Sequence, residues 1–199
     1  MKPYTFTLFL NLTLFCSSAV AGALGLDWGM DASAIYKKGV ELVKSGEQKQ
    51  ITIYTTERLP KNISNTAQYA LYVHATHGLQ KIVRVSNQFE DDVYGSKGKK
   101  EFAQLKQSLT EKYGEPSDGM EIVGLKLWDK SDEFYQCLAY QGCGIWARIF
   151  KSADASIMIE LRGLRRGEGY LMLHYDSFKW DEILDERNNK ERESNKDAL

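Results

Sequence analysis

The chain has 199 residues, a formal net charge of −1 and 12% aromatic residues. This length suffices for one folded domain. A near-neutral charge excludes the general affinity for nucleic acid that a strongly basic protein would have. The aromatic content excludes a disordered chain, because such chains lack the apolar surface that builds a core.

The first 21 residues have the pattern of a secretory signal peptide. One positive charge at Lys2 is followed by an uncharged, largely apolar run over 4–15 and by small residues ending in Ala19-Val20-Ala21. A charged start, an apolar run of about 7–15 residues and an A-x-A site define such a peptide. We predict cleavage before Gly22, with cleavage before Leu24 as the alternative. The run is too short to span a membrane, so the sequence predicts an exported protein.

The cysteines fit an exported protein with one disulfide. Cys16 leaves with the signal peptide; lipid anchoring through Cys16 is the alternative, but Phe15 stands where a small residue is usual. Cys137 and Cys143 remain, six residues apart. In an oxidising compartment such a pair is typical of a disulfide, worth about 2 kcal/mol for so short a loop. Two thiols are too few for a zinc site, so we predict a Cys137–Cys143 disulfide.

The first half of the mature chain predicts one helix and three strands. Asp31 is a good N-cap for a helix that we expect to run to about Lys44. Three segments then alternate apolar and polar residues with the period of a half-buried strand. A loop containing Pro60 separates the first two, and His77-Gly78 forms a turn before the third. These strands are predicted at 51–54, 69–74 and 83–86.

The second half predicts two helices, a short helix and four extended segments. A helix ends at Gly114-Glu115-Pro116, a typical stop signal, and its apolar residues recur at helical spacing. A last helix starts at Trp180. The polar tail over 188–199 is predicted to be frayed or disordered. Between the helices we expect an extended segment at 122–128, a short helix at 129–140, and strands at 145–150, 157–162 and 170–175.

This order of elements predicts an α+β fold with antiparallel sheet and with helices packed on one face. The order is helix, three strands, helix, strand, short helix, three strands, helix. Helices and strands segregate into blocks, and the short connections between the last three strands favour an antiparallel meander. We predict a single domain over 22–187; two loosely similar halves, 22–116 and 117–187, are the alternative.

Arginine and aromatic side chains gather around the predicted hairpin near residue 165. Both residue types anchor protein interfaces, so we predict a binding patch here; the alternative is an ordinary solvated hairpin. Arg162, Arg165 and Arg166 lie at the hairpin tip. We expect the rest of the patch on the sheet face that carries Arg162: Trp146, Arg148, Tyr170 and His174.

Motifs for catalysis are missing from the sequence. It contains no G-x-S-x-G, no Gly-rich phosphate loop and no H-E-x-x-H. We interpret His74, His77 and His174 as exposed residues on strand faces rather than metal ligands, because residues three apart on a strand face opposite sides. We therefore expect no metal, no cofactor and no catalytic residue, although two carboxylates that meet in space would leave an enzyme open.

Three stretches resemble small exported proteins of Gram-negative bacteria. They are L-D-W-G-M-D at 26–31, K-Y-G-E-P at 112–116 and G-Y-L-M-L-H-Y-D-S-F-K-W at 169–180. This resemblance implies a periplasmic location and no particular chemistry. At the level of fold alone, the chain is also similar to the helix-plus-sheet modules of outer-membrane assembly accessory proteins and β-lactamase-inhibitor proteins. Those proteins bind other proteins through a sheet face.

Taken together, these patterns predict a non-enzymatic periplasmic protein that binds another envelope protein or an envelope component through a sheet face. Nucleic acid is not an expected partner. One alternative is an immunity-type inhibitor of a toxin delivered to the periplasm. Another is an envelope hydrolase or small-ligand carrier, which would need a deep polar pocket holding two acids, or an acid with one of the histidines.

Overall fold

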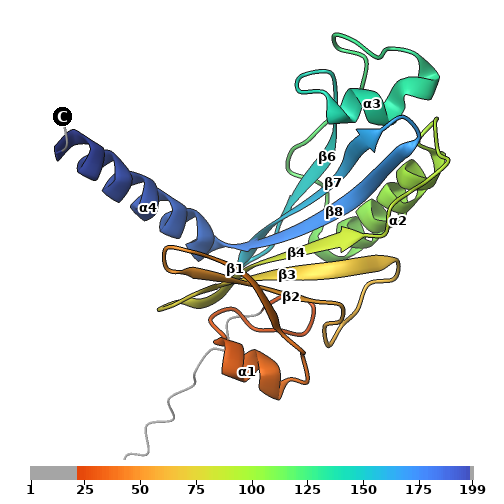
Figure 1. Ribbon diagram of the computed structural model, residues 1–199. Coiled ribbons are helices and arrows are strands. Elements are labelled where there is room, and N and C mark those ends of the chain that lie inside the picture. The colour runs from red at the N-terminus through yellow and green to blue at the C-terminus, as the bar shows by residue number, and fades with distance from the viewer. Residues whose placement is uncertain (1–21, 198–199) are drawn as a thin grey trace, which may run out of the picture.

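A single eight-stranded antiparallel sheet organises residues 22–197, the part of the chain that the computed structural model describes (Figure 1). The predicted signal peptide lies outside these residues. In space the strands follow the order β1-β2-β3-β4-β8-β7-β6-β5. The helices are α1 (Ala32–Lys37), α2 (Ser96–Tyr113), α3 (Phe134–Ala139) and α4 (Phe178–Asp197). The strands are β1 (Val43–Gln48), β2 (Ile51–Thr56), β3 (Thr66–His74), β4 (Gly78–Ser86), β5 (Glu121–Ile122), β6 (Ile145–Lys151), β7 (Ala155–Arg165) and β8 (Glu168–Ser177).

The sheet consists of two four-stranded meanders, β1 to β4 and β5 to β8, joined where β4 pairs with β8. Each meander follows its own helix, so the two halves share one topology. The boundary between them lies after Ser86, since α2 packs on β6, β7 and β8 of the second meander. A division at Pro116, the alternative that the sequence suggested, would separate α2 from the strands it covers.

Three of the four helices cover one face of the sheet, as the sequence predicted. Alternate residues of β7 and β8, such as Ile159 and Leu173, point to that face and are fully buried. Phe102 of α2, Ile35 of α1 and Phe134 of α3 complete the same core. The exception is α4, whose start packs on the opposite face in a small separate cluster: Ile51, Ile53, Tyr72, Trp180, Ile183 and Leu184.

The predicted helix from Asp31 to Lys44 is wrong in its second half. Asp31 caps α1 as expected, because its carboxylate accepts a hydrogen bond of 2.7 Å from the backbone N–H of Ala34. The helix then ends at Lys37, and Gly39 follows with φ 81°, a left-handed conformation that glycine adopts without strain. The chain turns here and forms β1, an edge strand that pairs with β2.

The remaining elements match the prediction with two differences. The segment predicted as extended over 122–128 forms only the two-residue strand β5 and a loop. The polar stretch after Arg187, predicted to be frayed or disordered, continues α4 as a helix to Asp197. Figure 1 shows this helix projecting away from the sheet. The predicted short helix is present as a 3₁₀ turn over Ser131–Glu133 followed by α3.

A buried arginine ties β4 to the loop before β3 and to α2. Arg84 is fully buried. Its Nε donates to Thr66 Oγ1 at 3.0 Å, and its Nη2 lies 2.7 Å from the carbonyl oxygen of Ser64 and 2.8 Å from that of Asn65. The same nitrogen forms an ion pair of 3.0 Å with Glu101 of α2. This side chain therefore positions a loop and a helix on the covered face.

A second buried polar contact joins α3 to the start of α2. The hydroxyl of Tyr135 donates to Asp92 Oδ2 at 2.9 Å, and the same oxygen accepts hydrogen bonds from the backbone N–H groups of Lys97 and Gly98. Burial, with the adjacent Asp92 carboxylate, raises the pKa of Tyr135 far above its ordinary value. A methyl group on Gly98 would lie 2.2 Å from the Tyr135 hydroxyl oxygen. Glycine is therefore required here for close packing.

Candidate interaction surface

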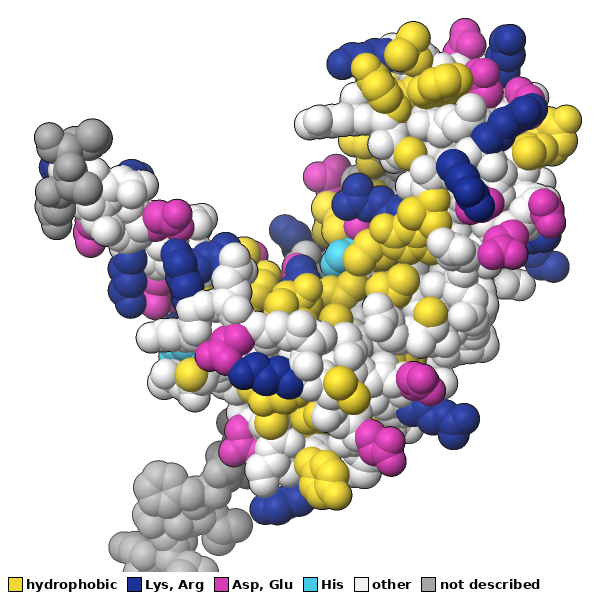
Figure 2. Space-filling model, viewed as in Figure 1, with side chains coloured by type: hydrophobic (Ala, Val, Ile, Leu, Met, Phe, Trp, Pro, Cys, Tyr) yellow, Lys and Arg dark blue, Asp and Glu magenta, His cyan; other side chains and the backbone are white. Residues whose placement is uncertain are grey.

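The face of the sheet opposite α1, α2 and α3 is accessible over most of its area, and we call it the open face. In Figure 2 hydrophobic side chains line a hollow on this side, between α4 and the end of the molecule that carries α3. The strand register defines the apolar members, since paired residues point to the same side. They are Ile53, Ala70, Tyr72, Val83, Val85, Ile149, Met158 and Met172.

The apolar strip is only half-buried. Val83, at the centre of the sheet, is 4% exposed because neighbouring side chains crowd it. Met158, Met172 and Tyr72 remain partly accessible. Met158 and Met172 are diagonal neighbours on β7 and β8, and flexible methionine side chains can adapt their shape to a partner. At one end of the strip Lys81 forms an ion pair of 2.9 Å with Asp176, a pair that fixes two charged groups on the same face.

A short chain of charged side chains crosses the open face. His174 Nε2 lies 3.1 Å from Glu160 Oε1, and Arg162 Nε lies 3.0 Å from Glu160 Oε2. Burial alone would raise the pKa of Glu160, but the hydrogen bond from His174 and the positive charge of Arg162 outweigh it, so the pKa lies below its usual value. Because Glu160 is ionised, the proton between it and His174 is on Nε2. The opposite ring nitrogen, Nδ1, is buried and has no hydrogen-bond partner among the described residues.

The predicted binding patch is divided between the two faces of the sheet. Arg162, Tyr170 and His174 lie on the open face. Arg148 pairs with Ile159, a core residue, so it points to the helix-covered face. Trp146 lies two residues earlier on the same strand and therefore points to that face as well. The prediction that all of these residues share one face is therefore wrong. A one-residue difference in register exchanges the two faces of a strand, and the sequence of a single strand does not fix the register.

On the covered face these two residues have structural contacts. The ring of Trp146 meets Phe134 edge to face, with the centroids 5.1 Å apart. Arg148 and Lys106 both bind Glu121 Oε1, at 2.8 and 2.6 Å. Burial would raise the pKa of Glu121, but these two cations hold it below its ordinary value. Trp146 therefore packs α3 on β6, and Arg148 attaches β5 and, through Glu121, α2 to the same strand. Neither residue lines the open face.

Two of the histidines are buried, although the sequence predicted that all three would be exposed. His74 and His174 are 7% and 9% exposed. Burial and the neighbouring His77 lower the pKa of His74, and its Nδ1 accepts hydrogen bonds from the backbone N–H groups of Thr76 and His77. Across residues 22–197, no group of three or more His, Cys, Asp or Glu side chains is arranged to hold a metal ion.

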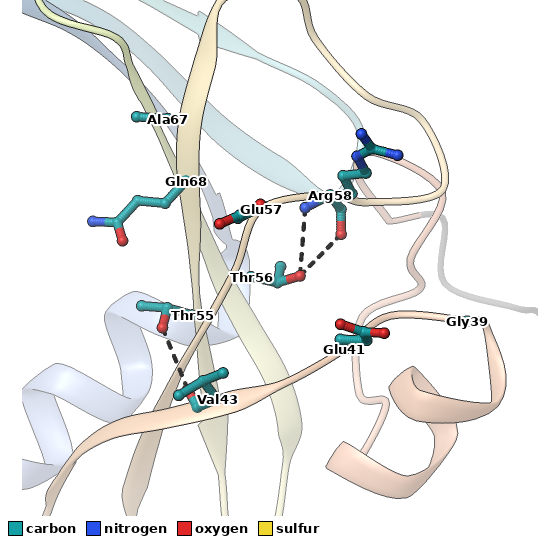
Figure 3. Close-up of a pocket in the computed structure, with 9 residues that line it drawn as sticks. All are labelled: Gly39, Glu41, Val43, Thr55, Thr56, Glu57, Arg58, Ala67 and Gln68. Atoms are coloured by element: carbon teal, nitrogen blue, oxygen red, sulfur yellow. Dashed lines mark hydrogen bonds between the residues drawn. The ribbon is translucent and has the colours of Figure 1, made fainter.

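A polar cavity of about 650 Å³ lies at the far edge of the sheet, where the chain leaves α1 and approaches β2 (Figure 3). It is lined in part by Glu41 and Glu57, the pair of acids that a hydrolase would need. Both side chains are exposed. Active sites exclude water from around the reacting groups, whereas these two carboxylates are open to solvent. The hydroxyl of Thr56 in the cavity wall bonds to the backbone of Arg58 and is already occupied.

A second surface, which was not predicted from the sequence, lies at the end of the molecule beside α3. We call it the apolar tip, and its members are between 39% and 55% exposed: Leu125, Leu127, Trp128, Tyr140 and Leu164. Four of the five lie within the cysteine loop or shortly before α3. The predicted disulfide between Cys137 and Cys143 is confirmed, with Cα atoms 5.1 Å apart. Large apolar residues clustered around a short disulfide loop are the signal in the sequence that could have located this surface.

The chain matches no protein-family model, no curated protein and no solved structure, so its surfaces are interpreted from their own geometry. Within residues 22–197, none of the helices combines the length and the apolar character needed to span a membrane.

Proposed function

We propose that this protein is a non-enzymatic periplasmic protein that binds another envelope protein through the open face. The observation that carries the proposal is the half-buried apolar strip around Met158, Met172 and Val85, on the part of the sheet that α4 leaves uncovered. Contiguous apolar surface of this kind is uncommon on monomeric proteins and marks interaction sites. The surface is formed by eight hydrogen-bonded strands. Such a surface is already ordered, so little conformational entropy would be lost when a partner binds.

The charged groups of the open face support recognition of a protein. Lys81 with Asp176, and Arg162 with Glu160 and His174, lie among the apolar residues of the strip. Protein interfaces usually combine apolar contacts with several hydrogen bonds. The alternative of an envelope hydrolase or small-ligand carrier is less well supported, since both acids that line the cavity of Figure 3 are exposed.

The periplasmic location rests on three observations. The first 21 residues have the signal-peptide pattern, the motifs resemble exported Gram-negative proteins, and the Cys137–Cys143 disulfide is typical of an oxidising compartment. Cleavage before Gly22 would keep Ala23, which is 4% exposed and packs in the main core. Cleavage before Leu24 would remove this core residue, so the first site is the better supported of the two.

Site-specific photo-crosslinking in the native host tests the proposal. A photoreactive amino acid replaces Met172 on the open face, or Gln104 on the exposed side of α2 as the control. We expect one dominant protein adduct from position 172 and none from position 104. Equal adducts from both positions, or none from position 172, would contradict binding through the open face.

A matched pair of charge variants then tests the surface itself. Met172→Lys places an ammonium group in the apolar strip, opposite Glu160, and Gln104→Lys adds the same charge on the far side. We expect the purified partner to lose binding to Met172→Lys only, with both variants melting close to the parent protein. If the partner is a toxic enzyme whose activity falls on binding, the immunity-type alternative is the correct form of the function.

A further inference from the structure

The apolar tip contains a small cleft suited to one side chain of a partner. The cleft has a volume of about 190 Å³. Sites for small molecules usually measure about 300–1,000 Å³, whereas a cleft of this size accommodates a single anchoring side chain. Its walls combine aromatic, aliphatic and cationic groups: Trp128, Gln136, Ala139, Tyr140, Leu164 and Arg165.

The two aromatic walls are held in place before any partner arrives. The disulfide brackets Tyr140, whose carbonyl oxygen accepts a hydrogen bond of 3.0 Å from the N–H of Cys143. The carbonyl oxygen of Cys143 in turn accepts one of 2.8 Å from Leu125, in the loop that carries Trp128. Trp128 has φ 59°, a left-handed conformation that is costly for a bulky residue and is found at functional sites. The indole remains 39% exposed.

Arg165 lines the cleft, Arg162 and Arg166 are near it in the chain, and all three present their guanidinium groups outward. Each is paired with an acid that is less exposed than the arginine itself: side-chain exposure is 53% for Arg162 and 12% for Glu160, and 77% for Arg165 and 22% for Glu168. Arg166 and Asp132 follow the same pattern. A guanidinium has five N–H donors, and one carboxylate uses at most two of them. The acids therefore orient the arginines, and the free donors face a partner.

We propose that the apolar tip is the anchor site for an acidic segment of a protein partner. The segment inserts one apolar side chain between Trp128 and Tyr140, and its carboxylates bind Arg165 and Arg166. The inference rests on the proposed function, because the segment would belong to the partner that binds the open face. Arginine binds carboxylates with two parallel hydrogen bonds. The arginines would therefore recognise the acidic residues of the segment, and the cleft would recognise its apolar side chain.

Three synthetic heptapeptides test this assignment on the mature protein: E-D-E-L-E-D-E, the same peptide with a central serine, and K-R-K-L-K-R-K. Binding is followed by NMR on the indole N–H of Trp128 and the amides of Tyr140 and Leu164. We expect the acidic leucine peptide to move these signals. The serine peptide should bind at least about tenfold more weakly because it buries no apolar side chain, and the basic peptide should leave the signals unchanged.

Two variants separate charge recognition from general electrostatics. Arg165→Glu combined with Arg166→Glu should raise the Kd of the acidic leucine peptide by at least about tenfold. Arg58→Glu changes an exposed arginine in the other half of the sheet and should leave the Kd unaltered. Equal binding by the acidic and basic peptides would overturn the assignment. So would tip signals that stay unmoved at about 1 mM acidic peptide, the weak limit of specific recognition.

Phosphatidylglycerol vesicles form the last arm of the test. If they move the tip signals and the acidic peptide does not, the tip binds a lipid surface and the assignment is wrong. The crosslink from position 172 reports separately on the open face. An adduct there with a silent tip refutes only the anchor site, and a responsive tip without that adduct refutes only the open face.

Discussion

Replacing Arg84 by methionine is expected to remove a large part of the stability of the fold. Arg84→Met keeps the length of the side chain and removes its charge and donors. The guanidinium is fully buried and contacts Ser64, Asn65, Thr66 and Glu101 at 2.7 to 3.0 Å. Removing one partner of a buried ion pair costs about 3–5 kcal/mol, since the other partner is left uncompensated.

The structure places the expected cost near the lower end of that range. The Glu101 side chain is 18% exposed and can recover some hydration, and Arg84 Nη1 is buried without a hydrogen-bond partner among the described residues. We expect the free energy of unfolding to fall by about 3 kcal/mol. For a chain of this size the melting temperature should fall by about 6–12 °C. Urea unfolding followed by circular dichroism measures the change in free energy.

Glu101→Gln is the matched control, since it keeps an acceptor for Arg84 while removing the charge. It leaves the buried guanidinium without its counter-ion and should therefore also cost about 3 kcal/mol. The double variant should cost less than the sum of the two singles because the residues share one interaction. A loss of less than about 1 kcal/mol for Arg84→Met would refute the reasoning. The loop before β3 and the position of α2 would then not depend on the guanidinium.

Two further predictions concern the second half of the chain. Gly98→Ala should destabilise the protein by about 1–3 kcal/mol through overpacking, because the added methyl would lie 2.2 Å from the Tyr135 oxygen. The cost should be smaller in a Tyr135→Phe background, which lacks that oxygen. Additive costs of the two changes in urea unfolding would argue against this contact. Replacing Cys137 and Cys143 by serine should lower the stability by about 2 kcal/mol without preventing folding, and an unchanged melting temperature in differential scanning calorimetry would show that the disulfide is unimportant.

The strands that the sequence predicted well are those with one face in the core. The buried Ile157, Ile159 and Leu161 alternate with the half-buried Met158 and Glu160 because β7 is fully buried on the helix side only. β1 was missed for the same physical reason: it is an edge strand in which five of six residues are exposed, so no alternation marks it. Gly39 was the one local signal that the preceding helix ends early.

The candidate surface was predictable in its residue types but not in its arrangement. Arg162, Tyr170 and His174 do lie together on the open face. Arg148 does not, since the pairing of Ala147 with Glu160 turns it to the other side. Pairing between strands is a property of the assembled sheet, so the sequence of one strand cannot fix it. The apolar tip escaped for a related reason, since Leu164 and Trp128 meet only in the folded chain.

The pairing of β4 with β8 also sets the order in which this protein can complete its fold. β4 ends the first meander and β8 ends the second, so the sheet stays open at its centre until nearly the whole chain has been made. An unpaired central strand is a template for pairing with another chain. Two chains that meet in this state could exchange their second meanders and form a domain-swapped dimer with the same strand pairs. The pairing of β4 with β8 is therefore the step at which slow folding and misassembly would begin.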